Sequence, residues 1–375
     1  MKPVEVAVIA GTFNYGGVEE VVMSYAEAID TDRVHFTLFV HDTSRWLREE
    51  RVKTCGADMI LIPSYWKPIA YQKALGKLFR EKRYDIVHSH VDRMSVFPLF
   101  AAWRAGIPVR ISHSHTTTEK CRTAKDYFRK ICATFSKMLA TEFCACSDLA
   151  GKDFYGKHSS YTVMPCATAY NRDKYLFDAA VRSEKRAELG IKENEIVLGH
   201  VGRFTGFKNH SFLVDVFAEM LKKTNTAKLL LVGDGTLLES TKEKVHQLGI
   251  EESVIFTGKR TDVNQLYQAM DAFLFPSLIG EGNPLTAMEA QYAGLPCLIS
   301  ENVTHEVVQN EKLVRFLSLD ESAELWAETA LEMLQNAEAR DSRSCCRGRT
   351  TAENELPPEE LTDWYCALAK SREDL

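Results

Sequence analysis

The amino-acid sequence predicts an α/β fold with two parallel sheets, and two observations support this. Short apolar runs rich in β-branched residues alternate with longer amphipathic stretches, which is the pattern of repeated strand–helix units around a parallel sheet. The stretch from Asn171 to Asn194 is charged and poor in apolar residues, and it separates two sets of such runs. At 375 residues the chain is long enough for two or three domains. We therefore expect a domain boundary near residue 180.

The apolar runs define the expected strands. The first set comprises Val6–Ala10, His35–Val40, Met59–Ile62, Asp85–His88, Val109–Ser112, Glu142–Ala145 and Thr162–Met164. The second set comprises Ile196–Val201, Lys228–Val232, Val254–Thr257, Ala272–Phe275 and Pro296–Ile299. The expected domains are residues 1–180 and 181–350. Residues 351–375 form a C-terminal segment with a last helix from Glu359 to Ala369.

The composition is that of an ordinary soluble enzyme, with 45% hydrophobic and 26% charged residues. The first residues lead directly into a strand and do not resemble a signal peptide, and no run of eighteen apolar residues predicts a membrane span. The cysteine pairs Cys144-Ala-Cys146 and Cys345-Cys346 lack the spacing of a zinc site. We expect free thiols, a cytoplasmic location and no nucleic-acid partner.

The net charge of −6 is unevenly distributed along the chain. Residues 1–180 carry 25 Lys and Arg against 20 Asp and Glu, a balance of +5, and the remainder carries 21 against 32, a balance of −11. Basic residues concentrate in two predicted amphipathic helices, Lys73–Arg83 and Arg122–Lys137. Such helices either lie on an anionic membrane or pack on a core with solvated cations. Packing is slightly favoured, and peripheral contact with the inner face of the cell membrane stays open. Their apolar faces comprise Leu75, Leu78 and Phe79 in the first helix, and Tyr127, Phe128, Ile131 and Phe135 in the second.

The stretch from Pro276 to Ser300 carries the strongest functional signal. It follows an apolar strand and contains Glu281 in a turn, Glu289 on a predicted helix, and Gly294 at the end of that helix. In parallel sheets, ligands bind beyond the carboxyl ends of strands. We therefore expect Glu281 at the mouth of such a crevice and Glu289 about two turns deeper.

The predicted helix start suits a ligand with both hydroxyl and phosphate groups. Carboxylates accept hydrogen bonds from sugar and ribose hydroxyls. A helix N-terminus favours anions, because its backbone N–H groups point outward. The backbone expected to face the phosphates comprises Gly282, Asn283, Pro284 and Leu285.

Two cations follow the first strand of the second half. Arg203 comes directly after Gly202, and Lys208 lies five residues further on. An Arg fork and a Lys point charge at one strand end can converge on a diphosphate and neutralise the charge of a leaving group. We expect Arg203 and Lys208 to take this role.

Glycine-rich turns follow strands in both halves. The first contains Gly16 and Gly17, where the absence of a β-carbon lets backbone approach a ligand closely. This turn is neither the G-x-G-x-x-G dinucleotide fingerprint nor a Walker A loop. Gly235 follows a strand in the second half, and a base-binding role competes there with a plain turn. Lys259 and Arg260, at a further strand end, are open in the same way.

Histidines cluster after two strands of the first half, as His88-Ser-His90 and His113-Ser-His115. Alternate residues of a strand share a face, so the spacing suits metal ligands. However, no matching carboxylate or cysteine set lies nearby in the sequence. We therefore expect no bound metal, and histidines that hydrogen-bond to a sugar hydroxyl or a phosphate.

The pair Glu281 and Glu289 resembles the Glu-x7-Glu motif of the retaining glycosyltransferases of family 4. That resemblance implies the GT-B fold, with two facing Rossmann-like domains, an interdomain cleft and a final helix that packs back on the first domain. It implies that Glu289 binds the nucleotide ribose and that Glu281 contacts the donor sugar. Arg203 and Lys208 match the residues of the family that bind the donor pyrophosphate.

The resemblance extends to other turns of the chain. It places Gly16 and Gly17 near the donor phosphates, Gly235 at the base, and one cleft histidine at the donor sugar, with His115 fitting best and His113 as the alternative. Two departures are visible. Three residues instead of two separate Pro276-Ser277 from Glu281, and the family's Asn-Gly-Ile-Asp is replaced by Pro165-Cys-Ala-Thr168.

The resemblance implies a retaining transfer of a hexose or N-acetylhexosamine. The donor would be a nucleotide-sugar, UDP-linked by expectation, and the acceptor a saccharide or polyprenyl-linked saccharide of bacterial surface polysaccharide assembly. No cofactor or metal is expected, because cationic side chains would stabilise the leaving diphosphate. Two alternatives remain open, a nucleotide-sugar 2-epimerase of the same architecture and a nucleotide-binding module without turnover. An NAD-dependent dehydrogenase is disfavoured by the missing fingerprint.

Overall fold

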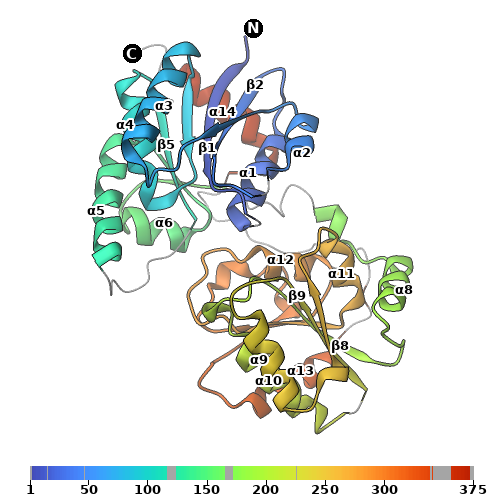
Figure 1. Ribbon diagram of the computed structural model, residues 1–375. Helices are drawn as coiled ribbons and strands as arrows, with labels where there is room; N and C mark the ends of the chain where they lie inside the picture. Colours follow the sequence, from blue (N-terminus) through green and yellow to red (C-terminus); the bar gives the residue numbers. More distant parts are fainter. Residues whose placement is uncertain are drawn as a thin grey trace. The chain divides into compact units, whose positions relative to one another are not determined.

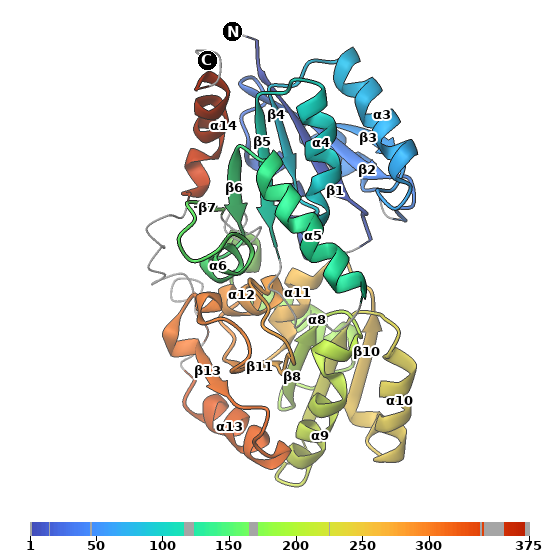
Figure 2. The same cartoon turned by 90° about the vertical axis from the view of Figure 1, so that its left-hand side faces the viewer.

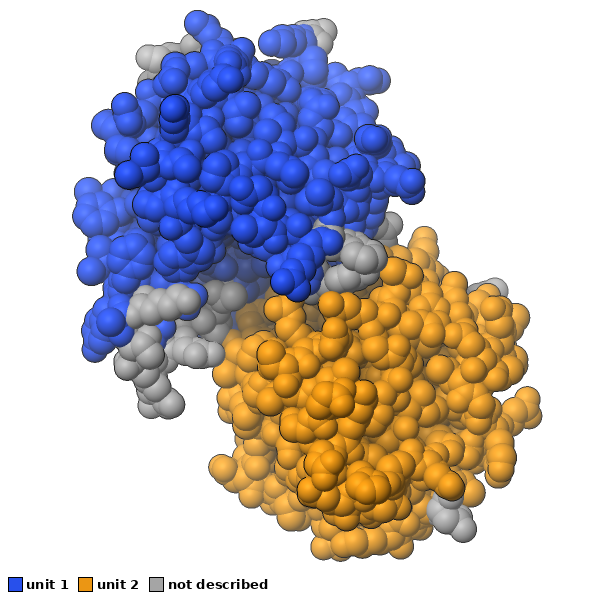
Figure 3. Space-filling view, viewed as in Figure 1, with its two compact units in different colours: residues 1–170, 351–375 blue, residues 171–350 orange. Residues whose placement is uncertain are grey.

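The computed structural model describes residues 2–14, 16–45, 47–115, 124–164, 172–224, 226–337, 340 and 356–371. The chain divides into two compact units (Figure 3). Unit 1 comprises residues 1–170 and 351–375, and unit 2 comprises residues 171–350. The division therefore falls nearer the N-terminus than the predicted residue 180, and the C-terminal segment belongs to unit 1.

Unit 1 is built on a seven-stranded parallel sheet in the order β3-β2-β1-β4-β5-β6-β7 (Figure 1). The strands are β1 (Val4–Gly11), β2 (Val34–His41), β3 (Asp58–Ile62), β4 (Ile86–Ser89), β5 (Val109–Ser114), β6 (Glu142–Ala145) and β7 (Thr162–Val163). The helices are α1 (Gly17–Ala28), α2 (Glu49–Thr54), α3 (Pro68–Glu81), α4 (Val96–Arg104), α5 (Ala124–Leu139), α6 (Asp148–Tyr155) and α14 (Leu361–Lys370).

Helices cover both faces of this sheet. Helices α3, α4 and α5 lie side by side on one face, as Figure 2 shows. Helix α3 buries Leu75 and Phe79 in a cluster with Phe39 of β2 and Leu99 of α4. The strand order reverses between β1 and β4, so the loops that follow these two strands diverge to opposite faces.

Helix α14 returns to unit 1 from the end of the chain and packs against α1, β1 and β2. The Thr362 hydroxyl accepts a hydrogen bond from the backbone N–H of Asp30 at 3.0 Å. The buried ring of Tyr365 meets Phe36 of β2 edge to face, at 5.4 Å between centroids. The helix thus supplies part of the core of unit 1.

Unit 2 contains a six-stranded parallel sheet in the order β10-β9-β8-β11-β12-β13. The strands are β8 (Ile196–Val201), β9 (Ala227–Val232), β10 (Val254–Gly258), β11 (Ala272–Phe275), β12 (Cys297–Ser300) and β13 (Val314–Leu317). The helices are α8 (Ala179–Glu188), α9 (His210–Leu221), α10 (Leu238–Gln247), α11 (Val263–Ala269), α12 (Leu285–Tyr292) and α13 (Ala323–Gln335).

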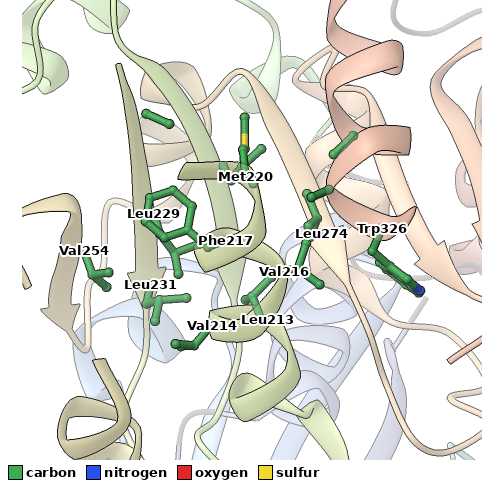
Figure 4. Packing of buried hydrophobic residues seen from close by; sticks show 14 of the residues in the cluster. Leu213, Val214, Val216, Phe217, Met220, Leu229, Leu231, Val254, Leu274 and Trp326 are labelled. Atoms are coloured by element: carbon green, nitrogen blue, oxygen red, sulfur yellow. The ribbon is translucent and has the colours of Figure 1, made fainter. Parts of the chain in front are cut away.

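The main core of unit 2 lies between the sheet and helices α9 and α13 (Figure 4). Phe217 of α9 and Trp326 of α13 are fully buried beside Leu229 and Leu274 of the sheet. The apolar strand runs identified in the sequence therefore face helices, as expected for parallel sheets. Within the described ranges, no helix combines the length and apolar content that crossing a bilayer would require.

The predicted α/β class and two parallel sheets are confirmed. Each predicted strand is present, and strand ends shift by one or two residues. Strand β13 was not predicted, because its run Val-Arg-Phe-Leu is short and interrupted by a charge. It lies at the edge of the sheet, where an exposed Arg315 is tolerated.

Candidate active site

The candidate site of unit 2 lies where its strand order reverses. Strands β8 and β11 are neighbours, and the chain leaves β8 toward β9 on one side and β11 toward β12 on the other. The loop after β8 carries Arg203 and Lys208, and the loop after β11 carries Glu281. Ligands of open α/β sheets bind at such reversals, beyond the carboxyl ends of the strands.

Lys208 and Glu281 meet at this position. The Lys208 ammonium donates to both carboxylate oxygens of Glu281, at 2.9 and 2.7 Å, and it lies 4.4 Å from the centroid of the Phe275 ring. The Ser277 hydroxyl donates to the same carboxylate at 2.7 Å. Because an ammonium has three N–H donors, two contacts with Glu281 leave capacity for an anionic ligand. The structure thus joins two of the residues that the sequence predicts.

Glu289 is held by two tyrosines. Its carboxylate accepts a hydrogen bond from the hydroxyl of Tyr175 at one oxygen and from the hydroxyl of Tyr267 at the other, both at 2.8 Å. Burial, with the nearby Glu289 carboxylate, holds the pKa of Tyr267 well above its ordinary value, so this hydroxyl stays a donor. A carboxylate oxygen has two lone pairs, so one hydrogen bond from a tyrosine does not by itself exhaust its acceptor capacity.

The helix that carries Glu289 begins beside Glu281. Pro284 is the N-cap of α12, and the residue before it, Asn283, is half-buried. Pro284 has no N–H, so it adds shape and no donor to the predicted phosphate-facing backbone. The first turn leaves the N–H groups of Leu285 and Thr286 without carbonyl partners inside the helix. Donors therefore remain at Leu285 and the residue that follows, and phosphate contacts of Gly282 and Asn283 stay a prediction.

The turn that contains Gly235 packs directly on the loop after β8. A β-carbon at Gly235 would lie 2.4 Å from the carbonyl oxygen of Phe204. Phe204 also donates its N–H to the carbonyl of Asp234 at 3.1 Å. Gly235 is therefore required for the close approach of two backbones, and this positions the loop with exposed Arg203. A base contact for Gly235 remains a prediction.

Within the described part of the chain, Arg260 forms ion pairs that hold a loop in place. Its guanidinium pairs with Asp262 at 2.6 Å and with Glu188 of α8 at 2.7 Å. These two ion pairs tie the loop after β10 to α8. The Lys259 ammonium lies 3.4 Å from a carboxylate oxygen of Asp234.

In unit 1, an internal carboxylate occupies the glycine-rich turn after β1. Gly16 is the N-cap of α1, and Gly17 is the first residue of that helix. The buried Glu19 carboxylate accepts the backbone N–H groups of Asn14 and Gly16, at 2.5 and 2.9 Å. Glu19 thereby supplies negative charge at this helix start, where the backbone N–H groups favour it. Glu19 thus caps this turn from within the chain, and the phosphate contact of Gly16 and Gly17 stays a prediction.

The predicted histidines form one buried cluster at the ends of β4 and β5. His88 and His113 share a hydrogen bond of 3.0 Å, and His90 and His115 share one of 2.9 Å. The second ring nitrogen of His88 bonds to the Tyr365 hydroxyl of α14 at 2.7 Å. His113 is fully buried, whereas His115 keeps partial exposure. Of these two histidines, His115 is therefore the one accessible to a ligand.

Burial also fixes the charge state of the cluster. It lowers the pKa of His88 and His115 to about 3 and holds the pKa of His90 and His113 well below the ordinary value. All four imidazoles are therefore neutral at pH 7.

Nitrogen atoms of His88, His90 and His113 lie within 4.8 Å of one another, close enough to suggest a metal site. The rings, however, are stacked, with 16° between the planes of His88 and His113 and 4.1 Å between the centroids of His88 and His90. Imidazole lone pairs lie in the ring plane, so stacked rings do not aim at one point, as tetrahedral zinc coordination requires. The geometry favours a hydrogen-bonded cluster.

Several functional residues escaped the sequence analysis. Tyr175 and Tyr267 lie far from Glu289 along the chain, and no spacing connects them. Glu19 follows Gly16 by three residues, which is the spacing of a capping box and was a usable signal. The altered segment Pro165–Thr168 lies outside the described residues.

Comparison with known proteins gives the family. Residues 181–344 match the family model "Glycosyl transferases group 1", and residues 16–158 match "Glycosyl transferase 4-like domain". The chain is 31% identical over 325 residues to EpsF of Bacillus subtilis strain 168, which is named as a glycosyltransferase, with 84% of each protein covered.

Two further similarities extend this result. A UDP-Gal:alpha-D-GlcNAc-diphosphoundecaprenol alpha-1,3-galactosyltransferase of Escherichia coli is 27% identical over 249 residues, which cover 64% of this chain and 63% of that protein. The crystal structure of Anabaena Alr3699/HepE in complex with UDP and glucose has a TM-score of 0.75 at 17% identity, covering 98% of this chain and 95% of that one. The two parallel sheets, the match of both halves to glycosyltransferase models and the similarity to EpsF together show that the chain belongs to the GT-B glycosyltransferases of group 1, family 4.

Proposed function

We propose that the protein transfers a hexose or N-acetylhexosamine from a UDP-sugar to a saccharide or polyprenyl-linked acceptor, with retention at the anomeric carbon. The observation that carries the proposal is the meeting of Lys208 and Glu281 at the strand-order reversal, with Glu289 on the adjoining helix. This set supplies one cation for a diphosphate and two carboxylates for hydroxyl groups.

Each residue of the set has a distinct role in the proposed binding of the donor. Lys208, with Arg203, faces the diphosphate and stabilises the charge that develops as it leaves. Glu281 orients the sugar through its hydroxyls, and the N–H groups at the start of α12 add donors for the phosphates. Glu289, positioned by Tyr175 and Tyr267, binds the ribose. A donor-sugar contact for His115 stays a prediction.

The proposed reaction breaks the bond from the anomeric carbon to the β-phosphate oxygen and forms a bond from that carbon to an acceptor oxygen on the same face. The proton of the acceptor hydroxyl passes to the departing phosphate. Lys208 offsets the charge of Glu281, and two hydroxyl donors stabilise the charged form of Glu289. Both carboxylates therefore suit binding better than proton transfer. The leaving-group charge is carried by side-chain cations, so we expect turnover without added metal.

The setting of the proposed reaction is surface polysaccharide assembly. Its support is the name of the relative from Escherichia coli, whose acceptor is a diphosphoundecaprenol-linked sugar. For this chain a polyprenyl-linked acceptor would place the reaction at a membrane surface. Both matched family models describe glycosyltransferases, which favours transfer over the epimerase alternative.

A thermal-shift panel with UDP, GDP, ADP and NAD, without metal, tests the donor class. A ligand at a hundred times its dissociation constant stabilises the folded state by about 2.7 kcal/mol, a shift of roughly 2–4 °C for a domain of this size. We expect UDP to give the largest shift. A shift with NAD alone would overturn the proposal, and the absence of a shift with every nucleotide would contradict nucleotide binding by this chain.

Replacement of Glu289 tests the ribose role. Glu289→Gln keeps the size of the side chain but replaces one acceptor oxygen by an NH2 donor, so it also loses one of the two hydrogen bonds accepted from the tyrosines. We expect UDP affinity to fall roughly tenfold, because one charge-assisted hydrogen bond is worth about 1.5–3 kcal/mol. Calorimetric titration with UDP measures this, with Gln247→Glu on the exposed end of α10 as the matched control. An unchanged affinity would remove Glu289 from the ribose site.

A further inference from the structure

One arginine joins the ends of two helices in unit 2. Arg340 follows helix α13 in the sequence, and its side chain reaches the C-terminal ends of the neighbouring helices α11 and α12 (Figure 2). Its Nε and Nη2 atoms donate to the carbonyl of Ala293, the C-cap of α12, at 2.9 and 2.6 Å. Its Nη1 atom donates to the carbonyls of Met270 and Gln268 at the end of α11, at 2.9 and 3.3 Å. One guanidinium therefore caps both helices.

This contact meets a general requirement of helix ends. The last carbonyl groups of an α-helix have no N–H partner within the helix, and the helix dipole adds partial negative charge there. A guanidinium carries a positive charge and offers five N–H donors in a rigid planar fork. Because different N–H groups of the fork serve different helices, Arg340 holds the ends of α11 and α12 at a fixed separation.

The two capped helices carry opposite partners of one hydrogen bond in the candidate ribose site. Glu289 lies on α12, and its backbone carbonyl accepts the N–H of Ala293, so it is one helical turn from the cap. Tyr267 lies on α11, and its hydroxyl donates to the Glu289 carboxylate at 2.8 Å. The backbone carbonyl of Tyr267 is itself 3.3 Å from Nη2 of Arg340. A change in the separation of the two helices would therefore change the bond between Tyr267 and Glu289.

Arg340 also reaches the second tyrosine of this site, through Gln268. The buried Gln268 amide donates to the backbone carbonyl of Tyr175 at 2.9 Å, and its oxygen accepts from Arg340 at 3.3 Å. The Arg340 guanidinium lies 4.4 Å from the centroid of the Phe177 ring, two residues after Tyr175. The segment that carries Tyr175 is thus fixed against the same guanidinium as the ends of α11 and α12.

We propose that Arg340 is a positioning residue for nucleotide binding, which holds Tyr175, Tyr267 and Glu289 in the arrangement that accepts the ribose hydroxyls. It acts through α11, α12 and Gln268, with its donors engaged on backbone carbonyls, and the ligand contacts are made by Glu289. The inference deepens the proposed function and rests on it, because it takes Glu289 as the ribose-binding group.

Calorimetric titration with UDP and with 2′,3′-dideoxy-UDP tests this role. The two nucleotides differ only in the ribose hydroxyls, so the ratio of their dissociation constants measures what the ribose site contributes. We expect the wild-type protein to prefer UDP by about tenfold or more, since a hydrogen bond to a charged group contributes roughly that factor. Arg340→Met should lose most of this preference, with weaker binding of UDP and unchanged binding of dideoxy-UDP. An equal loss of affinity for both nucleotides would indicate general destabilisation and overturn the proposal.

Arg182→Met is the matched control. Arg182 of α8 donates to the same carbonyls of Gln268 and Met270, and it pairs with Asp271 at 2.6 Å. Its bonds in the described part of the chain do not include α12. This exchange should therefore remove a cap of α11 and keep the preference for UDP. The same loss of preference in both variants would assign the effect to α11 alone and contradict a link between the two helices.

Arg340→Lys provides a second variant in case Arg340→Met does not fold. Lysine keeps the charge, but its ammonium is a point donor without the planar fork. We expect a preference for UDP smaller than that of the wild-type protein, because one ammonium cannot reproduce the bonds to both helix ends. A preference equal to that of the wild-type protein would show that charge alone suffices, which would overturn the proposed role of the fork.

The wild-type titration separates this inference from the proposed function. Equal binding of the two nucleotides by the wild-type protein, or binding of neither, would remove the ribose role of Glu289 and this inference with it. A wild-type preference for UDP that Arg340→Met retains in full would overturn this inference alone and leave the proposed function standing.

Discussion

Replacing Lys208 by alanine should reduce turnover by about 10² or more, the cost of removing one preorganised charge stabiliser. The ammonium lies at the strand-order reversal with 12% of its side chain exposed, so water replaces it poorly. Turnover is measured as UDP release with the donor that the nucleotide panel selects. We expect the fall in kcat and in kcat/KM to be similar, since the leaving group gains charge only in the transition state. A near wild-type rate would remove Lys208 from the site.

The ion pair with Glu281 requires a second variant, because alanine at residue 208 also leaves that carboxylate without its cation. The double variant Lys208→Met with Glu281→Gln removes both charges and keeps both side-chain volumes. The comparison is with Glu281→Gln alone, because that exchange already removes the carboxylate proposed to orient the sugar. If Lys208 only held Glu281, the double variant would match Glu281→Gln. If Lys208 stabilises the leaving diphosphate, the double variant is slower than Glu281→Gln by a further factor of about 10² at unchanged thermal stability. Lys244→Ala is the matched control, because it breaks an ion pair of similar length with Asp215 away from the site.

Acidification from pH 7 to pH 5.5 should destabilise unit 1 by about 1 kcal/mol for each buried histidine of the cluster. The ordinary histidine pKa is near 6.5 in an unfolded chain, and burial lowers that of His88 and His115 to about 3. Below pH 6.5 these histidines therefore bind protons in the unfolded state but not in the folded state. The contribution of these histidines to the free energy of unfolding is fully present above pH 6.5, and it is lost as the pH falls toward 3.

The groups around the cluster do not offset this effect. Tyr365 bonds to His88 as a neutral hydroxyl, and the Asp92 carboxylate accepts the backbone N–H of His115. Urea unfolding at several pH values measures the slope. His113→Asn keeps an amide where the ring bonds to His88 and removes one titrating group, so the slope should fall by the contribution of one histidine.

His246→Gln is the control for the acid effect, since His246 is exposed and Glu251 raises its pKa. This exchange should not flatten the acid slope. Stability that is indifferent to pH, or that rises on acidification, would contradict neutral burial of the cluster.

The fold was predictable because the strands of a parallel sheet are buried on both faces, and each such strand is therefore an apolar run in the sequence. The ends of strands β8, β9 and β11 were predicted in this way to within one residue. Strand β13 lacked that signal because it is an edge strand. In the site, Lys208 and Glu281 could each be predicted from their positions after strands. The ion pair between them forms because β8 and β11 are adjacent in the sheet, and no local sequence pattern predicts that adjacency.

Two further features depended on long-range packing. Tyr175 and Tyr267 reach Glu289 from separate elements, so their role has no counterpart in local spacing. The periodicity of α5 defined its apolar face but could not say whether other residues cover it. The same pattern in α3 leads to a buried face. Periodicity assigns side chains to faces, and only the tertiary structure decides which face meets water.

Because α14 packs on unit 1, unit 1 can complete its folding only after the end of the chain has been synthesised. The hydrogen bond between His88 and Tyr365 joins residues 277 positions apart, and all of unit 2 is translated between them. Unit 2 has its own sheet and core, so it can fold while the nascent unit 1 still lacks the side chains that cover Phe36 and His88. A chain released before residue 361 would therefore carry a complete unit 2 and a unit 1 with an exposed apolar face, which is the kind of species that chaperones bind. The N-terminal sheet, made first, is completed last.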